Sequence, residues 1–285
     1  MINHQPSAQD LAARIIEAQA GTTALHQAAQ EGTLQNLCGV TAEFLANVKN
    51  DYGWTPLDHA AREGYLDQIP GITAEFLATV KNDYGWTPLH NAAEHGHLDQ
   101  IPRVTAELLA TVKNNTGWTP LHTAAWHGHL DQIPGVTVEF LANVKSNTGN
   151  TPLHFAASYG HHDQIPGVTA ELLATVKDNY GETPLHIAAE NGHLKQIGDL
   201  TIKLAEEMGI LNAALRPHNI SAFTEDFRRN GTAYNKHPAI RRALLRAAHA
   251  LPRLTATQRS VVKATLSAAQ EGGFMLTPKA LAKLL

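Results

Sequence analysis

The strongest constraint on the fold of this 285-residue chain is a sequence that repeats every 32 residues. The copies open on glycines, namely Gly21, Gly53, Gly85, Gly117, Gly149 and Gly181. The best-preserved copies read Thr-Pro-Leu-His, one variable residue, two alanines and, after two more residues, a second glycine. A fixed period of this length is typical of stacked repeats, in which neighbouring copies bury a continuous core that no single copy could form.

The opening of each copy predicts a short helix, as the third copy illustrates. Thr87 is suited to the N-cap, where its hydroxyl can meet an unpaired backbone N–H group. Pro88 then occupies the first helical position, where its missing N–H costs nothing. The leucine and alanines that follow form a narrow apolar stripe at helical spacing. Gly96 is expected to end the helix as a left-handed cap.

The second half of four copies contains a proline, at Pro70, Pro102, Pro134 and Pro166. Proline removes a helical hydrogen bond and disfavours helix at the residue before it. We therefore expect, in the third copy, a short turn over 98–101, a break, and a second short helix that starts at Thr105. Thr105 can cap this helix, and Glu107 in its first turn favours the positive helix end.

The words TPLHNAA, TPLHTAA, TPLHFAA and TPLHIAA closely resemble the ankyrin repeat, and the resemblance covers about residues 21 to 212. It implies an all-α solenoid of six ankyrin-like repeats. The sixth copy departs from the others in its second half, where charged residues of alternating sign lie four apart. This spacing predicts a continuous helix that ends at Gly209. The charged residues are Lys195, Asp199, Lys203 and Glu207.

Three parts are expected along the chain. Residues 1–20 contain a helix, over 8–20, that caps the first repeat; the array occupies 21–212; and a basic helical segment occupies 213–285. Residues 1–209 hold 10 Lys and Arg against 23 Asp and Glu, a net charge of −13, while residues 210–285 hold 12 against 3, a net charge of +9. Such asymmetry indicates two parts with different partners, or two parts that attract each other.

The basic segment resembles no family that the sequence reveals. We expect a polar loop over 216–236 with a short helix around 223–227, because the loop contains the turn-forming pair Asn230-Gly231. An amphipathic helix follows over 238–251. Another helix, over 255–270, opens with a Thr255…Gln258 capping box. Thr277-Pro278 then begins a last short helix.

The charge asymmetry predicts that the basic segment docks on the sixth repeat. In this arrangement the apolar side of the 238–251 helix covers the end of the array. The arginines Arg241, Arg242 and Arg246 then lie along acidic residues of the last repeats, namely Glu182, Glu190, Glu206 and Glu207. The alternative is an exposed basic surface that binds nucleic acid or an acidic membrane.

The sequence holds no catalytic, metal-binding or cofactor signature. Nine of the 17 histidines fall in two fixed repeat columns, and the resemblance implies that they form structural hydrogen bonds within and between repeats. The lone Cys38 lies in an apolar stretch and is expected in the core. No transmembrane run or leader sequence is evident, so we expect a cytoplasmic protein or one delivered into another cell's cytosol.

The most informative side chains are aromatic. The resemblance implies that the turn and the inner helix of each repeat line a concave binding face. Nine aromatic residues occupy these variable positions: Tyr52, Trp54, Tyr84, Trp86, Trp118, Trp126, Phe155, Tyr159 and Tyr180. For the tryptophans that follow the glycines, packing against adjacent turns is an alternative. Phe44, Phe76 and Phe140 share a column in the second half and are expected in the core.

The leading function is therefore protein–protein recognition, without catalysis or a cofactor. A rigid scaffold presents an acidic, aromatic-rich surface, and such exposed aromatics are typical interface anchors. Two other classes remain open. The array could regulate a basic segment that binds nucleic acid or an acidic membrane, or residues 213–285 could form an effector or toxin-like domain.

Overall fold

The computed structural model describes residues 21–37, 39–197, 200–216 and 219–276. Every regular element in these ranges is a helix. The chain divides into two compact units, Met1–Pro152 and Leu153–Leu285, and each is described separately below. The predicted helices over 8–20 and after Pro278, and the position of Cys38, lie outside the described residues.

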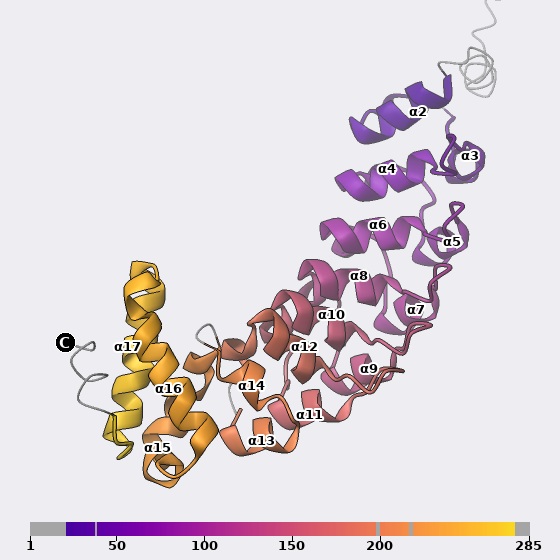
Figure 1. The fold of residues 1–285 in the computed structure, drawn as a ribbon. Helices are drawn as coiled ribbons and strands as arrows, with labels where there is room; N and C mark the ends of the chain where they lie inside the picture. Colours follow the sequence, from indigo (N-terminus) through magenta and orange to yellow (C-terminus); the bar gives the residue numbers. More distant parts are fainter. Residues whose placement is uncertain (1–20, 38, 198–199, 217–218, 277–285) are drawn as a thin grey trace, which may run out of the picture. The chain divides into compact units, whose positions relative to one another are not determined.

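The first unit consists of stacked helical repeats in two layers (Figure 1). The longer helices α2, α4, α6 and α8 lie side by side, and the short helices α3, α5, α7 and α9 form the second layer. The elements are α2 (Gly21–Gln30), η1 (Leu34–Asn36), α3 (Ala42–Asn47), α4 (Pro56–Glu63), η2 (Leu66–Gln68), α5 (Ala74–Thr79), α6 (Pro88–His95), η3 (Leu98–Gln100), α7 (Ala106–Thr111), α8 (Pro120–His127), η4 (Leu130–Gln132) and α9 (Val138–Asn143).

The predicted pattern within one repeat is confirmed. Helix α6 begins at Pro88, and Gly96 ends it with a φ of 75°. A single 3-10 turn follows, and Ile101 is extended, which creates the break before Pro102. Helix α7 then starts after Thr105, whose hydroxyl accepts a hydrogen bond from the Leu108 N–H at 3.2 Å. Each of these boundaries depends on residues at most four positions away.

Neighbouring repeats are joined by apolar packing and by hydrogen bonds that recur along the array. Leu89, Ala92 and Ala93 on the inner face of α6 are fully buried. Lysine ammonium groups also bridge successive repeats, because Lys81 Nζ donates to the carbonyl of Lys113 at 2.9 Å and Lys113 Nζ donates to that of Lys145 at 2.8 Å. These contacts repeat at the period of the sequence and hold the repeats in register.

The buried histidine column supplies a second set of bridges, as the resemblance implied. The Thr87 N–H donates to His90 Nδ1 at 3.2 Å, so the proton lies on Nε2, which donates to the carbonyl of Trp118 in the next repeat at 3.1 Å. Burial lowers the pKa of His90 to about 4, which keeps the ring neutral at physiological pH. His122 makes the corresponding contacts with Thr119 and Asn150.

The second unit continues the repeats and adds a bundle of longer helices (Figure 1). Its elements are α10 (Pro152–Tyr159, which begins at the last residue of the first unit), η5 (His162–Gln164), α11 (Ala170–Thr175), α12 (Pro184–Asn191), η6 (Leu194–Gln196), α13 (Ile202–Glu207), α14 (Leu211–Ala214), η7 (Ile220–Phe223), α15 (Thr224–Tyr234), α16 (Pro238–Ala250), η8 (Leu251–Arg253) and α17 (Ala256–Glu271). The predicted helices over 238–251 and 255–270 are confirmed, as is the Thr255–Gln258 capping box.

The prediction of a continuous helix in the sixth repeat was wrong. Ile197 is extended, and α13 begins only after Thr201, whose hydroxyl accepts a hydrogen bond from the Leu204 N–H at 3.1 Å. The Lys203–Glu207 pair does form, at 3.6 Å. Exposed i,i+4 ion pairs contribute only about 0.3–0.5 kcal/mol each, whereas an N-cap contributes about 1 kcal/mol. The capped second helix of the other repeats therefore persists.

The predicted loop over 216–236 was also wrong, because most of it forms η7 and α15; the short helix expected around 223–227 is present as the start of α15. The pair Asn230-Gly231 lies inside α15 rather than in a turn. Gly231 is required by packing, since a Cβ atom there would lie 2.7 Å from the carbonyl oxygen of Ala269 in α17. Asn230 instead donates to Asp226 one turn earlier, at 2.8 Å.

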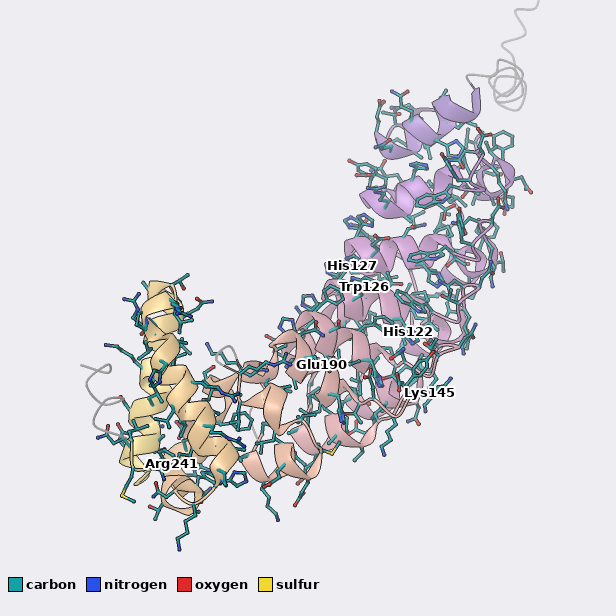
Figure 2. All side chains as sticks on the ribbon, viewed as in Figure 1. His122, Trp126, His127, Lys145, Glu190 and Arg241 are labelled. Carbon is teal, nitrogen blue, oxygen red and sulfur yellow. The ribbon has the colours of Figure 1, made fainter. Side chains whose placement is uncertain are left out.

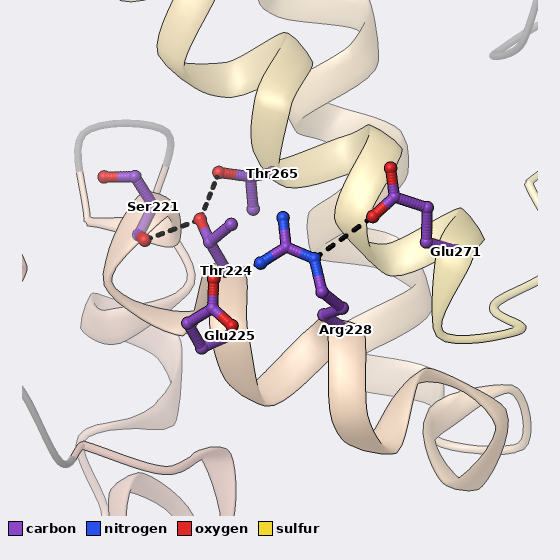
Figure 3. A network of polar contacts seen from close by, with 6 residues as sticks. All are labelled: Ser221, Thr224, Glu225, Arg228, Thr265 and Glu271. Atoms are coloured by element: carbon purple, nitrogen blue, oxygen red, sulfur yellow. Dashed lines mark hydrogen bonds and ion pairs between the residues drawn. The ribbon is translucent and has the colours of Figure 1, made fainter.

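Polar contacts join α15 to α17 near this crossing (Figure 3). Arg228 pairs with Glu225 on its own helix, and its Nε donates to Glu271 Oε2 on α17 at 3.1 Å. The hydroxyl of Thr224 donates to the Ser221 carbonyl at 2.8 Å and lies 2.9 Å from that of Thr265. The two acids are therefore engaged within the bundle.

The segment packs on the sixth repeat as predicted, but through other residues. Asn219 donates to the carbonyl of Ala189 at 2.6 Å, Asp226 accepts from the Ile202 N–H at 2.8 Å, and His237 Nε2 lies 3.1 Å from Glu206 Oε1. The apolar side of α16 was expected to cover the last repeat. Instead, α14 and η7 make contact with it.

The predicted ion pairs of the docked segment are not formed. Within the described residues, no ion pair joins Arg241, Arg242 or Arg246 to an acid of the repeats, and all three arginines are exposed. Glu190 and Arg241 lie at separate places in this unit (Figure 2). Backbone caps, amide contacts and the His237–Glu206 contact, rather than the arginines of α16, therefore join the segment to the last repeat.

Candidate protein-interaction surface

The turns that precede the inner helices are shaped by one side chain each. The Oδ1 atom of Asn50 accepts hydrogen bonds from the N–H groups of Tyr52 and Trp54, both at 3.0 Å. Asn82 and Asn114 make the same pair of contacts in the next two turns, and Asp178 does so in the second unit. This arrangement holds the backbone on both sides of each repeat glycine, and so fixes where the aromatic side chains leave the turn.

Successive turns are close enough that their backbones touch. The Asn115 N–H donates to the carbonyl of Tyr84 at 3.1 Å, and a Cβ atom on Gly53 would lie 2.5 Å from Asp83 Oδ1. The turn tips are therefore a stacked, ordered row rather than independent loops.

Four of the nine predicted aromatic residues are exposed, and all four are tyrosines. Tyr52, Tyr84, Tyr159 and Tyr180 expose 67%, 59%, 46% and 79% of their surface. Among the described residues, the only other large hydrophobic side chain of comparable exposure is Met275. Exposed aromatic side chains are therefore confined to the positions that the sequence predicted.

The three tryptophans that follow the glycines are half-buried, and each ring contacts the inner helix of its own repeat. The Trp54 ring lies 5.9 Å from that of His59, and the Trp86 ring lies 5.2 Å from that of His90. Each tryptophan therefore packs on its own inner helix and still exposes part of its ring to solvent.

Trp126 extends this contact at the end of α8. Its ring lies 5.0 Å from that of Trp118 and stacks on His127, and His127 Nε2 lies 3.9 Å from Glu94 Oε1 of the preceding repeat. Figure 2 shows Trp126 and His127 together at this end of the repeat, with Lys145 on the opposite side. Sequence reasoning named only the aromatic members and missed His127 and Glu94, although both occupy the same variable columns.

Two expectations about this surface need correction. The position after Thr-Pro-Leu-His was expected to face the partner, yet Asn91 and Thr123 are buried there, whereas Phe155 is half-buried. Phe76 and its column mates at 44 and 140 were expected in the core but are half-buried. In α5, Ala74 and Leu77 occupy the buried positions, which leaves Phe76 at the edge of the packed face.

A buried carboxyl group lies behind the surface in the second repeat, where Asp58 replaces the usual histidine. Asp58 Oδ2 accepts from the backbone and hydroxyl of Thr55 at 2.8 and 2.9 Å, and Oδ1 accepts from Asn91 Nδ2 at 2.9 Å. Burial raises the pKa of Asp58 to about 6 despite these hydrogen bonds. Thr55 belongs to the same repeat as Asp58 and Asn91 to the next one, so these hydrogen bonds join two repeats.

This raised pKa makes the contribution of Asp58 to stability depend on pH. Between pH 3.8 and about 6 the folded chain holds a proton that the unfolded chain has lost, so stability falls as the pH rises through this window. We expect Asp58→Asn to increase the free energy of unfolding by about 1–2 kcal/mol at pH 7.5, with a gain that shrinks toward pH 4. The new amide oxygen accepts from Thr55, and the new Nδ2 donates to Asn91 once the Asn91 amide turns over to present its Oδ1. Urea unfolding at pH 7.5 and at pH 4 measures this difference in the free energy of unfolding, and Asp67→Asn at an exposed position serves as the control. An equal loss of stability at both pH values would contradict it.

No three His, Cys, Asp or Glu side chains within the described residues are grouped to hold a metal ion. None of the helices in the same ranges is long and apolar enough to cross a membrane.

Comparison with known proteins agrees with the repeat geometry. A family model described as ankyrin repeats (3 copies) matches residues 70–134 and 135–201. A search of the curated proteins found no match. Ankyrin repeats are in general protein-interaction modules and are typically non-catalytic. The bridging histidines and the left-handed glycine caps agree with this match: residues 70–201 match ankyrin repeats, and the repeated helix pairs outside them are consistent with an ankyrin array.

Proposed function

We propose that the array binds a protein partner through an aromatic face formed by its turns and inner helices. The face comprises Tyr52, Trp54, Tyr84, Trp86, Trp118, Trp126, Phe155, Tyr159 and Tyr180. The observation that carries the proposal is the confinement of exposed aromatic rings to these positions. Tyrosine offers a large, rigid contact area together with a hydroxyl group, which is why it is common among interface anchors.

The charge of the array supports a basic partner. Residues 1–209 carry a net charge of −13, and exposed acids such as Asp51 and Asp83 stand directly beside the tyrosines at 52 and 84. Complementary charge raises association rates and suppresses wrong partners. We further infer that the array acts as a scaffold without catalysis, and that it works in a reducing compartment such as the cytosol, because the single cysteine excludes an intrachain disulfide.

Partner binding should depend on the most exposed tyrosines. We expect a chain with Tyr52, Tyr84 and Tyr180 all changed to Ala to bind its partner at least 100-fold more weakly, since one hot spot contributes about 2 kcal/mol or more. The melting temperature should change little, because these rings are mostly in solvent. Partners are first captured with the intact chain, and their affinities for both chains are then measured by calorimetry.

A control variant carries Thr79→Ala, Thr111→Ala and Thr175→Ala, three exposed positions on the second-layer helices. It should bind as the unmodified chain does. Equal weakening by both variants, or unchanged binding by the tyrosine variant, would refute the aromatic face.

A further inference from the structure

The helices after the sixth repeat carry an excess of basic residues. Between residues 210 and 276 there are 10 Lys and Arg and only three acids. Glu225 and Glu271 both pair with Arg228, and Asp226 is buried, where it accepts from the Ile202 N–H and the Tyr234 hydroxyl. The acids are thus engaged internally, and the arginines at 242, 246 and 253 are exposed to solvent.

Three of these arginines share one side of α16 and η8 with a histidine. Arg242, Arg246, His249 and Arg253 recur three and four residues apart, so their side chains align along the helix. The three arginines and His249 are exposed. The row spans about 17 Å at the rise of an α-helix. We call it the basic face of α16.

The opposite side of α16 is occupied. Ile240, Ala243, Leu244, Ala247 and Ala248 are buried, and α16 packs on α17. A helix binds a membrane interface by inserting its apolar side, and this side is already covered. The basic face can therefore act only by contact between charges at its surface.

Guanidinium groups favour a particular partner. Arginine binds phosphate oxygens through paired hydrogen bonds, and it loses less hydration than lysine when it does so. The basic face holds three arginines and no aromatic residue, so it lacks the means to stack on bases. Its chemistry suits the regularly spaced phosphates of a nucleic-acid backbone, which carries one negative charge per about 1.7 Å of duplex length.

We infer that the basic face of α16 binds the phosphate backbone of a nucleic-acid duplex without reading its sequence. This goes beyond protein recognition by the array. Because the face lies on α16 and η8 and contains none of the predicted aromatic residues, its function is tested independently of the tyrosines at 52, 84 and 180.

The test measures binding of the full chain to a fluorescein-labelled 20-base-pair DNA duplex by anisotropy, between 50 and 200 mM KCl. Three phosphate contacts give a slope of about −2.7 in log affinity against log salt, hence an approximately 40-fold loss of affinity over this range. Arg242→Glu, Arg246→Glu and Arg253→Glu combined should abolish measurable binding. The corresponding lysine variant should retain part of the affinity.

The matched control reverses three exposed charges elsewhere in the same segment, Arg216, Arg229 and Lys236, each to Glu. It has the same net charge as the first variant and should bind within about threefold of the unmodified chain. Equal losses in both variants would mean that net charge alone drives binding, and would overturn the assignment. So would an absence of duplex binding at 50 mM KCl.

Two further measurements test whether the basic face binds another kind of partner. Sedimentation with vesicles that contain 30% phosphatidylserine tests an acidic membrane, and analytical ultracentrifugation tests association with the acidic array of a second copy. Binding in either arm that the three glutamates remove, without binding to DNA, would overturn the nucleic-acid assignment. Circular dichroism of each variant should match that of the unmodified chain, because the changed side chains are exposed.

Discussion

Replacing Gly231 by alanine should destabilise the C-terminal helices by about 2–3 kcal/mol, although the same change within an ordinary exposed helix stabilises by up to about 1 kcal/mol. A Cβ atom on Gly231 would lie 2.7 Å from the carbonyl oxygen of Ala269 and 2.9 Å from the backbone of Gly272. These neighbours are backbone atoms, so they cannot rotate away as a flexible side chain would.

The crossing of α15 and α17 leaves little room for adjustment. A Cβ atom on Gly272 would in turn meet the carbonyl of Phe227, and the Thr232 N–H donates to the Gly272 carbonyl at 2.8 Å. Separating the helices to admit a methyl group would therefore break hydrogen bonds as well as packing. Hydrogen exchange should show faster exchange of the amides of α15 and α17 in Gly231→Ala.

Ser267→Ala serves as the control, because this exposed residue lies on α17 and the change should be neutral or slightly stabilising. If Gly231→Ala proved as stable as the unmodified chain, the close crossing of α15 and α17 would be incorrect.

His162→Leu should stabilise the second unit by about 1–3 kcal/mol at pH 7.5, which is the usual cost of a buried polar group without a partner. His162 exposes 1% of its surface, and neither ring nitrogen forms a hydrogen bond of ordinary geometry within the described residues, although the Ala156 backbone interacts weakly with the ring. The equivalent positions in the neighbouring copies hold leucines, among them Leu130 and Leu194, and both of these are buried.

The gain should grow as the pH falls. Burial lowers the pKa of His162, with a smaller opposing effect of Asp163; His193 and His161 lower it further, while the Ala156 carbonyl raises it slightly. Below the ordinary pKa of 6.5 the unfolded chain takes up a proton that the folded chain resists, so the unmodified protein loses stability on acidification. The leucine variant lacks this loss, and its advantage should be larger at pH 5 than at pH 7.5.

Urea unfolding at the two pH values measures the effect. The reciprocal change Leu194→His should introduce the same defect in the sixth repeat, with lower stability and greater acid sensitivity. A stability gain that did not depend on pH would show that packing volume, rather than the unpaired imidazole, distinguishes His162.

Much of the array follows from the sequence because its determinants are local. The cap at Thr105, the break before Pro102 and the left-handed Gly96 each involve residues within four positions, and their 32-residue recurrence specifies the stack. The resemblance placed Tyr52 and Tyr84 in the turns, and the structure adds the local reason, since the neighbouring asparagine fixes the turn that carries each one.

Contacts between residues distant in the sequence decided the rest. Asn230-Gly231 has the local signature of a turn, yet the approach of α17 about 40 residues later keeps it helical. The arginines of α16 were expected to meet the acids of the last repeats, but Asn219 and Asp226 made the docking contacts and left the arginines in solvent. Local propensity could not decide between a turn and a helix at residues 230–231, because the deciding contacts form only when the folded helices meet. Charge balance could not decide how the segment docks, because net charge carries no information about which side of a helix is covered.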